Sequence, residues 1–248
     1  MKIIGAIPAR WGSTRFEGKV LADINGRPMI QHVWQRAKQS RLLEDVFIIC
    51  DDERIFDAAQ IFGARVVMSS PEHPSGTERI AHAMRHSAAD IIVNIQGDEP
   101  LIQPQVIDAL AQALVHDAAA VMATVIKVIK HEDDVHNPNV VKVVIDQQQN
   151  ALYFSRSPIP YNRDKKTFNN LTYYKHLGLY AYRRDFLCRF KDLPLSQLEQ
   201  TEKLEQLRVL ESGYKIKTIL TDYETIGVDV PEDLNRVLEL MNKETSYG

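Results

Sequence analysis

The sequence lacks the features that mark several large classes of protein. Its 248 residues include only two cysteines, Cys50 and Cys188, both in apolar surroundings. No apolar run reaches the roughly 18 residues that span a membrane, and the N-terminus shows no basic segment followed by an apolar core. We therefore expect a cytoplasmic protein without membrane insertion, in which both cysteines are buried small residues rather than a disulfide pair.

Strong positive charge is also missing. The formal net charge of −3 provides no general attraction to nucleic acid or to an anionic membrane. No Gly-x-Gly-x-x-Gly follows a strand-like segment, so a dinucleotide-binding fingerprint is absent. A P-loop is excluded by spacing, because five residues separate Gly12 from Gly18 and Val20 follows the lysine.

What the sequence does contain is a loop with three cations directly after its first predicted strand, residues 3–7. Arg10, Arg15 and Lys19 lie in this loop together with two glycines. Backbone N–H groups of a turning loop converge on anions, and cationic side chains balance the anion's charge. Residues 10–19, called the cationic loop below, therefore predict a phosphate-binding site.

Short apolar runs alternate with helical patterns through the first half of the chain. The predicted strands are 3–7, 46–50, 65–68 and 91–95, and the predicted helices are 29–40, 53–62, 78–86 and 104–116. This alternation is typical of an α/β fold with a mostly parallel central sheet flanked by helices. Ligands of such sheets bind at the carboxyl ends of strands, so the chemistry is expected just after residues 7, 50 and 95.

The pattern changes after residue 120. Predicted strands at 121–128, 140–145, 151–154 and 175–182 have few helices between them, 161–172 is predicted to be a mobile loop, and helices return at 198–210 and 232–242 around a last strand at 216–220. We expect one domain, 1–248, with a nucleotide-binding half over 1–125. The second half, 126–248, is predicted to add a smaller sheet that serves as a substrate platform.

Two carboxylates follow the buried strand that ends near residue 95, in the segment Gln96-Gly97-Asp98-Glu99-Pro100. We call this segment the acidic turn. A carboxylate here can hold Mg²⁺ over a triphosphate, and because Mg²⁺ usually takes one or two protein carboxylates, Asp98 needs at most one partner. Asp229, shortly before the last predicted helix, is the best candidate. The alternative for both residues is a helix-capping carboxylate.

A third cluster, His73-Pro74-Ser75-Gly76-Thr77-Glu78-Arg79, joins a strand to a helix and offers hydroxyl and N–H groups. Such a turn can contact the polar edge of a base. It also fits the N-terminus of a helix, with Ser75 as the cap and Glu78 completing a capping box. The two roles are compatible.

In their order along the chain, these segments resemble the 3-deoxy-manno-octulosonate cytidylyltransferase (CMP-Kdo synthetase) family over essentially the whole length. The family pattern appears at residues 7–10, 13–15, 18–19, 75–79, 96–100, 151–156, 175–178, 204–208 and 227–234. The first loop and the acidic turn fit many sugar nucleotidyltransferases, whereas the last four segments resemble this family in particular. One departure is Glu17, where the family usually has Pro; this change predicts a looser loop and an unfavourable carboxylate unless it points away from the phosphates.

The resemblance implies a Rossmann-like nucleotidyltransferase fold and a homodimer formed through the smaller sheet. It implies that CTP and the acidic sugar Kdo become CMP-Kdo and pyrophosphate, for lipopolysaccharide biosynthesis. The sugar's anomeric hydroxyl would attack the α-phosphorus directly, which agrees with a chain rich in cations and carboxylates, because phosphoryl transfer depends on positioning and charge neutralisation.

The resemblance also implies roles for individual residues. The catalytic residues are Arg15, Lys19, Asp98 and Asp229, and the last two hold Mg²⁺. The nucleotide-binding residues are Ala9, Arg10, Ser13, Arg15, Lys19, Ser75, Gly76, Arg79 and Gln96, with Ser75 and Gly76 at the cytosine. A sugar acid calls for an Arg among neutral hydrogen-bonding groups, and the predicted sugar-binding residues are Gln96, Arg156, His176, Tyr180, Glu205 and Gln206.

Two other functions stay open at this point. One is a cytidylyltransferase for the 8-amino analogue of Kdo or for another sugar acid. The other is a nucleotide-sensing module without catalysis, which the joint presence of Arg15, Lys19, Asp98 and Asp229 argues against.

Overall fold

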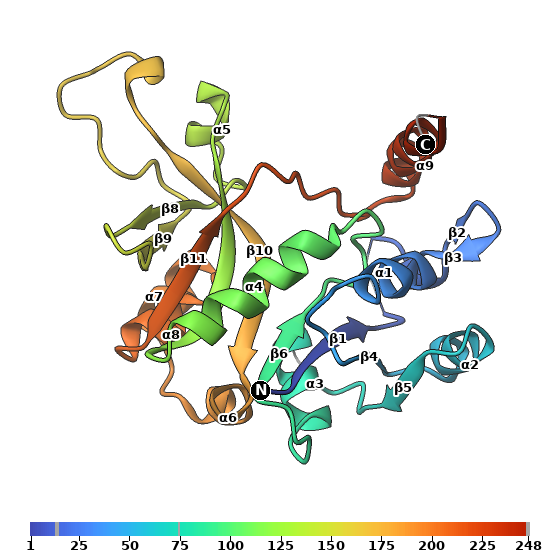
Figure 1. Ribbon diagram of the computed structural model, residues 1–248. Coiled ribbons are helices and arrows are strands. Elements are labelled where there is room, and N and C mark those ends of the chain that lie inside the picture. The colour runs from blue at the N-terminus through green and yellow to red at the C-terminus, as the bar shows by residue number, and fades with distance from the viewer. Residues whose placement is uncertain (13–14, 74, 247–248) are drawn as a thin grey trace.

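The computed structural model describes residues 1–12, 15–73 and 75–246, and its centre is a nine-stranded sheet (Figure 1). The strand order is β11-β7-β10-β6-β1-β4-β5, with β8 paired to β10 and β9 paired to β8. The strands are β1 (Ile3–Ala9), β4 (Asp45–Cys50), β5 (Arg65–Met68), β6 (Ile91–Asn94), β7 (Ala120–Val128), β8 (Lys142–Ile145), β9 (Ala151–Ser155), β10 (Tyr174–Arg183) and β11 (Lys215–Leu220). A separate antiparallel pair consists of β2 (Asp23–Ile24) and β3 (Arg27–Pro28).

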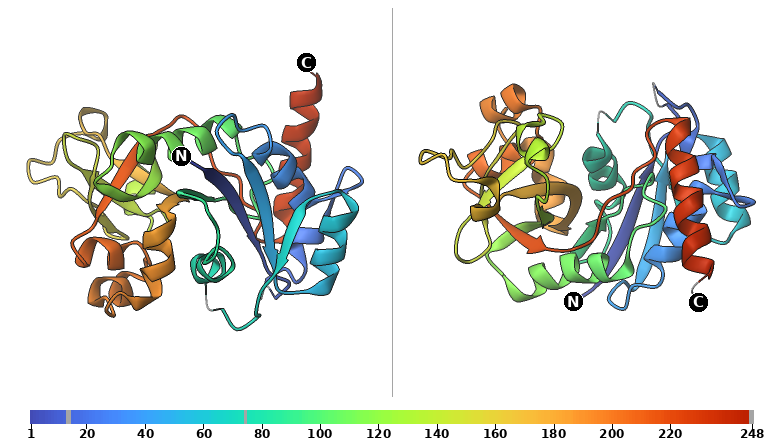
Figure 2. Two further views of the ribbon diagram at one scale, coloured as in Figure 1. Left: turned by 60° about the horizontal axis from the view of Figure 1, so that its bottom comes forward. Right: turned by 90° about the horizontal axis from the view of Figure 1, so that it is seen from above.

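Helices cover both faces of the sheet (Figures 1 and 2). They are α1 (Met29–Ala37), α2 (Glu53–Ile61), α3 (Gly76–Ala83), α4 (Pro104–His116), α5 (Glu132–His136), α6 (Arg184–Arg189), α7 (Gln197–Glu202), α8 (Leu207–Glu211) and α9 (Pro231–Ser246). One core cluster packs Ile3 and Ile7 of β1 with α1, α2 and α4, while Ile4 packs on the other face with α3, α6 and α8. Burial on both faces explains why β1 is apolar at almost every position.

The predicted α/β class is confirmed. Strands β1, β4, β5 and β6 are parallel, as is the β7–β11 pair, and β10 runs antiparallel between β6 and β7. The strands predicted after residue 120 exist, and β7, β10 and β11 continue the sheet of the first half. The antiparallel β8–β9 pair lies at its margin.

The second half differs in detail from the sequence-based prediction. The helix predicted over 198–210 is split into α7 and α8, because Lys203 adopts a left-handed conformation with φ of 56°. Two short helices, α5 and α6, were not predicted. Residues 161–172 contain only a single 3₁₀ turn, Phe168–Asn170.

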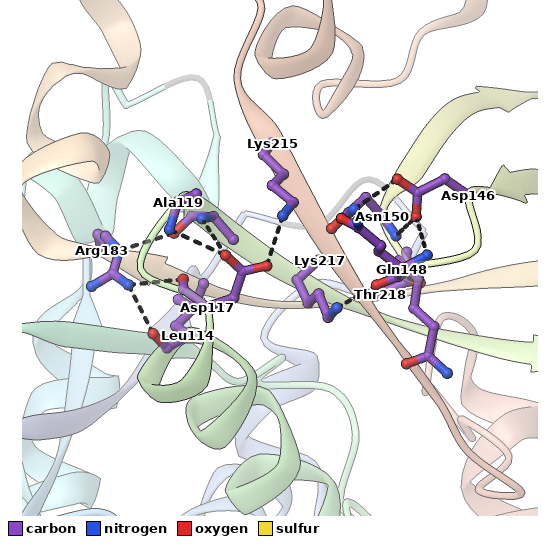
Figure 3. Close-up of polar contacts among 12 residues, drawn as sticks. Leu114, Asp117, Ala119, Asp146, Gln148, Asn150, Arg183, Lys215, Lys217 and Thr218 are labelled. Carbon is purple, nitrogen blue, oxygen red and sulfur yellow. Dashed lines mark hydrogen bonds and ion pairs between the residues drawn. The ribbon is translucent and has the colours of Figure 1, made fainter.

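Polar contacts fasten the amino ends of β7 and β11 to α4 (Figure 3). The Arg183 guanidinium donates to the carbonyls of Leu114, Asp117 and Ala120, and the Asp117 carboxylate lies 2.9 Å from Lys215 Nζ. A cation at a helix C-terminus is also favoured by the helix dipole. This bracing lies at the end of the sheet opposite the cationic loop.

Both cysteines are free thiols, and the prediction that both are buried is correct for Cys50 but not for Cys188. Cys50 is buried, and this burial raises the pKa of its thiol to about 11; Cys188 is half-buried. Across the described residues, no helix has the combined length and apolarity to cross a membrane.

Candidate functional site

A cleft of about 250 Å³ opens where β1 and β6 end. Three segments line it: the cationic loop, the acidic turn and the turn that precedes α3. Among the predicted nucleotide-binding residues, the cleft brings together Ala9, Arg10, Lys19, Ser75, Gly76, Arg79 and Gln96. Arg15 does not line it, and Ser13 lies outside the described residues. The carboxyl ends of strands therefore form the cleft where the sequence placed it.

The acidic turn and the turn before α3 both pack against Pro8 of β1. A Cβ atom on Gly97 would lie 2.9 Å from the Pro8 carbonyl oxygen, and one on Gly76 would lie 3.3 Å from Pro8 Cγ. The first distance is too short for any side chain, so the acidic turn can approach β1 this closely only with glycine at position 97.

A cation lies between the two predicted metal ligands. Lys19 Nζ is 2.6 Å from Asp98 Oδ2 and 3.2 Å from Asp229 Oδ1, and it donates to the Val228 carbonyl at 2.9 Å. Arg15 pairs with the other oxygen of Asp229 at 3.1 Å. The structure thus brings together all four predicted catalytic residues.

The segment that carries Asp229 crosses from β11 to α9 (Figure 1). We call residues 221–230 the strap. The Val228 N–H donates to the Asp98 carbonyl at 2.9 Å, which joins the strap to the acidic turn. At its other end, Glu224 pairs with Lys127 of β7 at 2.7 Å and with Lys175 of β10 at 2.6 Å. These contacts hold Asp229 opposite Asp98 although the two residues are far apart in sequence.

Glu99 differs from its neighbour Asp98. Burial raises the pKa of Glu99 to about 8, and the charge of Asp98 adds to the effect. Tyr223 of the strap lies with its hydroxyl 3.4 Å from the Glu99 carboxyl. Asp98, whose side chain is 30% exposed, is therefore the carboxylate of the acidic turn that a cation can reach.

The turn before α3 is a helix N-terminus, as the capping pattern predicted. The Ser75 hydroxyl accepts from the Glu78 N–H at 3.2 Å. The Arg79 guanidinium, almost fully buried, pairs with Asp51 at 2.9 Å and donates to Ser69 Oγ and to the Ser70 carbonyl. Arg79 therefore lines the cleft, but its guanidinium N–H groups already form hydrogen bonds within the protein.

Sequence reasoning missed Asp51. Its other carboxylate oxygen accepts from the Trp11 N–H at 2.9 Å, so one buried carboxylate joins the cationic loop to α3 through Arg79. The signal was its position at the carboxyl end of β4, one of the three strand ends where the site was expected.

The predicted sugar-binding residues form a second group beside the cleft. Gln96 Nε2 donates to the Gly178 carbonyl of β10 at 3.1 Å, which connects the acidic turn to this group. Tyr180 donates to Gln206 Oε1 at 3.4 Å, while Gln206 Nε2 is buried without a hydrogen-bond partner among the described residues. A buried unpaired amide is costly, so Gln206 is suited to receive an acceptor atom of a ligand.

Two further members of the group have perturbed ionisation. His176 lies between the rings of Phe154 and Tyr180, with Nε2 2.9 Å from Thr124 Oγ1; burial lowers the pKa of the imidazole to about 3. Burial raises the pKa of Glu205, whose carboxyl accepts from Thr77 of α3 at 2.7 Å. A neutral imidazole is suited to hydroxyl groups rather than to carboxylates.

Arg156 lies apart from the nucleotide cleft. Its Nε donates to the Glu202 carbonyl at 2.7 Å, and its Nη1 donates to the Pro138 carbonyl at 2.9 Å. The guanidinium therefore braces the C-terminus of α7 and the loop that follows α5, in addition to any contact with substrate.

Comparison with known proteins agrees with this geometry. The Cytidylyltransferase family model matches residues 4–219. The 3-deoxy-manno-octulosonate cytidylyltransferase of Solibacter usitatus is 51% identical, covering 100% of this chain and 97% of its own length. That of Geotalea uraniireducens is 52% identical, covering 98% of this chain and 100% of its own.

The chain belongs to the 3-deoxy-manno-octulosonate cytidylyltransferase family. A solved CMP:2-keto-3-deoxy-manno-octonic acid synthetase complexed with CTP superposes with a TM-score of 0.93 at 44% identity, covering 98% of this chain and 100% of that one. The 4-diphosphocytidyl-2C-methyl-D-erythritolsynthase of Anaerococcus prevotii, at 14% identity and a TM-score of 0.63, shares the fold alone; it covers 97% of this chain and 99% of its own. The resemblance inferred from the sequence is confirmed, and the chain is a nucleotidyltransferase.

Proposed function

We propose that this cytidylyltransferase transfers CMP from CTP to Kdo and releases pyrophosphate, as a step of lipopolysaccharide biosynthesis. The observation that carries the proposal is the meeting of the cationic loop, the acidic turn and the turn before α3 in one cleft. The match to a relative solved with CTP supports CTP as the nucleotide, and the names of the relatives support Kdo as the acceptor.

The residues of the cleft perform this reaction by positioning and charge neutralisation. Arg10, Arg15 and Lys19 neutralise the β- and γ-phosphates, so that pyrophosphate becomes a better leaving group. The anomeric hydroxyl of the sugar attacks the α-phosphorus, its bond to phosphorus forms as the bond to pyrophosphate breaks, and no covalent enzyme intermediate is formed. Ser75 and Gly76 contact the cytosine.

The carboxylates of Asp98 and Asp229 fit a divalent cation. They face the single position that the Lys19 ammonium takes, so this position already favours positive charge. The described part of the chain has no group of three or more His, Cys, Asp or Glu side chains that could hold a metal. Mg²⁺ does not need such a group, because it usually binds one or two protein carboxylates and keeps several waters. Bound Mg²⁺ supplies neutralisation of the triphosphate and a lower pKa for the attacking hydroxyl.

The sugar acid is proposed to bind beside the cleft. Gln96, His176, Tyr180, Glu205 and Gln206 offer donors and acceptors to its hydroxyl groups, and Arg156 pairs with its carboxylate. The division into a nucleotide half over 1–125 and a sugar and dimerisation half over 126–248, the homodimer and the cytoplasmic location are further parts of this proposal.

The test is pyrophosphate release by the purified protein with Mg²⁺, in a panel of nucleotides and sugars. CTP, ATP, GTP and UTP are each combined with Kdo, its 8-amino analogue or sialic acid. Release with CTP and Kdo alone is the expected result. Faster release with the amino analogue or with sialic acid would identify that sugar as the acceptor in place of Kdo. No release with any pair would favour a nucleotide sensor.

A further inference from the structure

Trp11, at the start of the cationic loop, contacts several other residues of the protein through its backbone and its ring. Its N–H donates to Asp51 at 2.9 Å, and its carbonyl accepts from the Gly18 N–H at 3.0 Å. Its indole N–H donates to Glu17 Oε1 at 2.7 Å, and the Arg54 guanidinium lies 3.4 Å from the ring centroid. Trp11 and Gly18, near the two ends of the cationic loop, are thereby joined.

Gly18 is shaped by the same ring. It has a left-handed φ of 66°, and a Cβ atom there would lie 2.7 Å from the Trp11 ring. Both the conformation and the contact require glycine. Lys19, which pairs with Asp98, directly follows Gly18. Because the indole ring packs on Gly18, its position affects where the Lys19 ammonium lies.

Glu17 has a use that the sequence alone did not show. Its carboxylate is directed at the indole N–H, while Arg54, which is held by Asp52 at 2.7 Å, covers the face of the ring. A hydrogen bond that the side chain at position 17 accepts from Trp11 thus restrains the loop where a proline would restrain it through a fixed φ.

We propose that Trp11 is the positioning residue of the cationic loop and that Glu17 is the latch that holds it. The proposal rests on the proposed function, because the loop's purpose is to place Arg15 and Lys19 for a triphosphate. When the latch is lost, Trp11 and Glu17 are no longer tied together, and CTP must order the Lys19 side of the loop at a cost in affinity. The sugar site on β10 does not share these contacts.

The experiment measures CTP affinity by calorimetry for Glu17→Ala, Trp11→Phe and the double variant. Each single variant is expected to weaken CTP binding about tenfold, and the double variant by about the same factor, because either change breaks the same hydrogen bond. Glu17→Gln keeps an acceptor oxygen and is expected to restore most of the affinity. The KM for Kdo and the melting temperature should stay close to wild type, which separates positioning from a loss of fold. Exposed Glu44→Gln serves as the charge-matched control.

A spectroscopic measurement reports on the latch directly. The chain has only two tryptophans, so Trp34→Phe leaves Trp11 as the single indole. CTP is expected to shift its emission little in the latched protein and markedly in the Glu17→Ala background. Unchanged CTP affinity in Glu17→Ala, or additive losses in the double variant, would overturn the latch while leaving the proposed function intact. Absence of CTP binding by the wild type would overturn both.

Discussion

Lys19 Nζ lies 2.6 Å from Asp98 Oδ2, so a protein ammonium holds the position that we propose for a divalent cation. The lysine is well buried, with its side chain 14% exposed, and Asp229 completes its carboxylate partners at 3.2 Å. In the proposed function, cation binding therefore competes with this ion pair, and a cation that takes the place of the lysine makes it available to phosphate.

Replacement of Lys19 by Met is expected to strengthen Mn²⁺ binding in the absence of nucleotide by about tenfold, or ~1.4 kcal/mol, because the competing ammonium is removed. Turnover should fall at least a hundredfold, since the phosphates lose a counter-charge. Electron paramagnetic resonance titration with Mn²⁺ measures the first effect, and exposed Lys130→Met is the control. Equal or weaker Mn²⁺ binding would show that the ammonium and the metal do not share a position.

Asp98→Asn is expected to reduce kcat by about a thousandfold or more while the protein stays folded. The Asp98 carbonyl would still accept from Val228 N–H, so the strap keeps its place. Asp222→Asn, an exposed carboxylate on the same strap, should leave kcat unchanged. Activity near wild type in Asp98→Asn would remove this residue from the metal site.

Asp51→Asn breaks a buried ion pair and leaves the Arg79 guanidinium without its counter-charge, which costs about 3–5 kcal/mol in the free energy of unfolding. Asp45→Asn, which breaks a pair with the exposed Arg65, is expected to cost only about 0–1 kcal/mol. Urea unfolding of both variants measures the difference. Similar values for the two would mean that the Asp51 pair is energetically an ordinary surface pair.

His176 gives a pH dependence of known sign. Burial lowers the pKa of the native imidazole to about 3, whereas the unfolded residue titrates near the ordinary histidine pKa of about 6.5. The native state therefore binds fewer protons, and the stability that this residue contributes is present above pH 6.5 and is lost as the pH falls toward 3. At about pH 5 the loss is about 1–2 kcal/mol, and His176→Gln should abolish it. Urea unfolding at two pH values, with exposed His116→Gln as control, tests this; an unaltered pH slope in His176→Gln would contradict it.

Arg156→Ala is expected to raise the KM for Kdo about tenfold or more, with little change in the KM for CTP, because a carboxylate partner is lost. The C-terminus of α7, at Glu202, and the loop that carries Pro138 also lose these hydrogen bonds, so the melting temperature should fall by a few degrees. Arg156→Lys keeps the charge and tests whether the paired donors matter. Equal rises of both KM values would remove Arg156 from the sugar site.

The sequence predicted the parts of the site that depend on strand ends. A loop after β1, a turn after β6 and a turn before α3 must meet in a parallel sheet, and the pattern of apolar runs showed where each strand stops. Asp229 was selected as the partner of Asp98 from its place before the last helix, and the structure brings both carboxylates to Lys19. Asp51 was missed, because nothing local in the sequence shows that one carboxylate serves both Trp11 and Arg79.

Other features depended on tertiary contacts that no local pattern shows. The left-handed Lys203 splits a continuous helical pattern into α7 and α8. Lys127 and Lys175 become partners of Glu224 only because the strap crosses the ends of β7 and β10. The sequence predicted that Glu17 loosens the loop and places an unfavourable carboxylate in it. In the fold, Glu17 accepts a hydrogen bond from Trp11.

The most direct test of the account is ³¹P NMR of the enzyme with CTP, Mg²⁺ and Kdo that carries ¹⁸O at the anomeric hydroxyl. Direct attack of the anomeric hydroxyl predicts one pyrophosphate and one CMP-Kdo per CTP consumed, with ¹⁸O in the bond between sugar and phosphorus. Loss of the label from that bond, or pyrophosphate released without Kdo, would contradict direct transfer to the sugar.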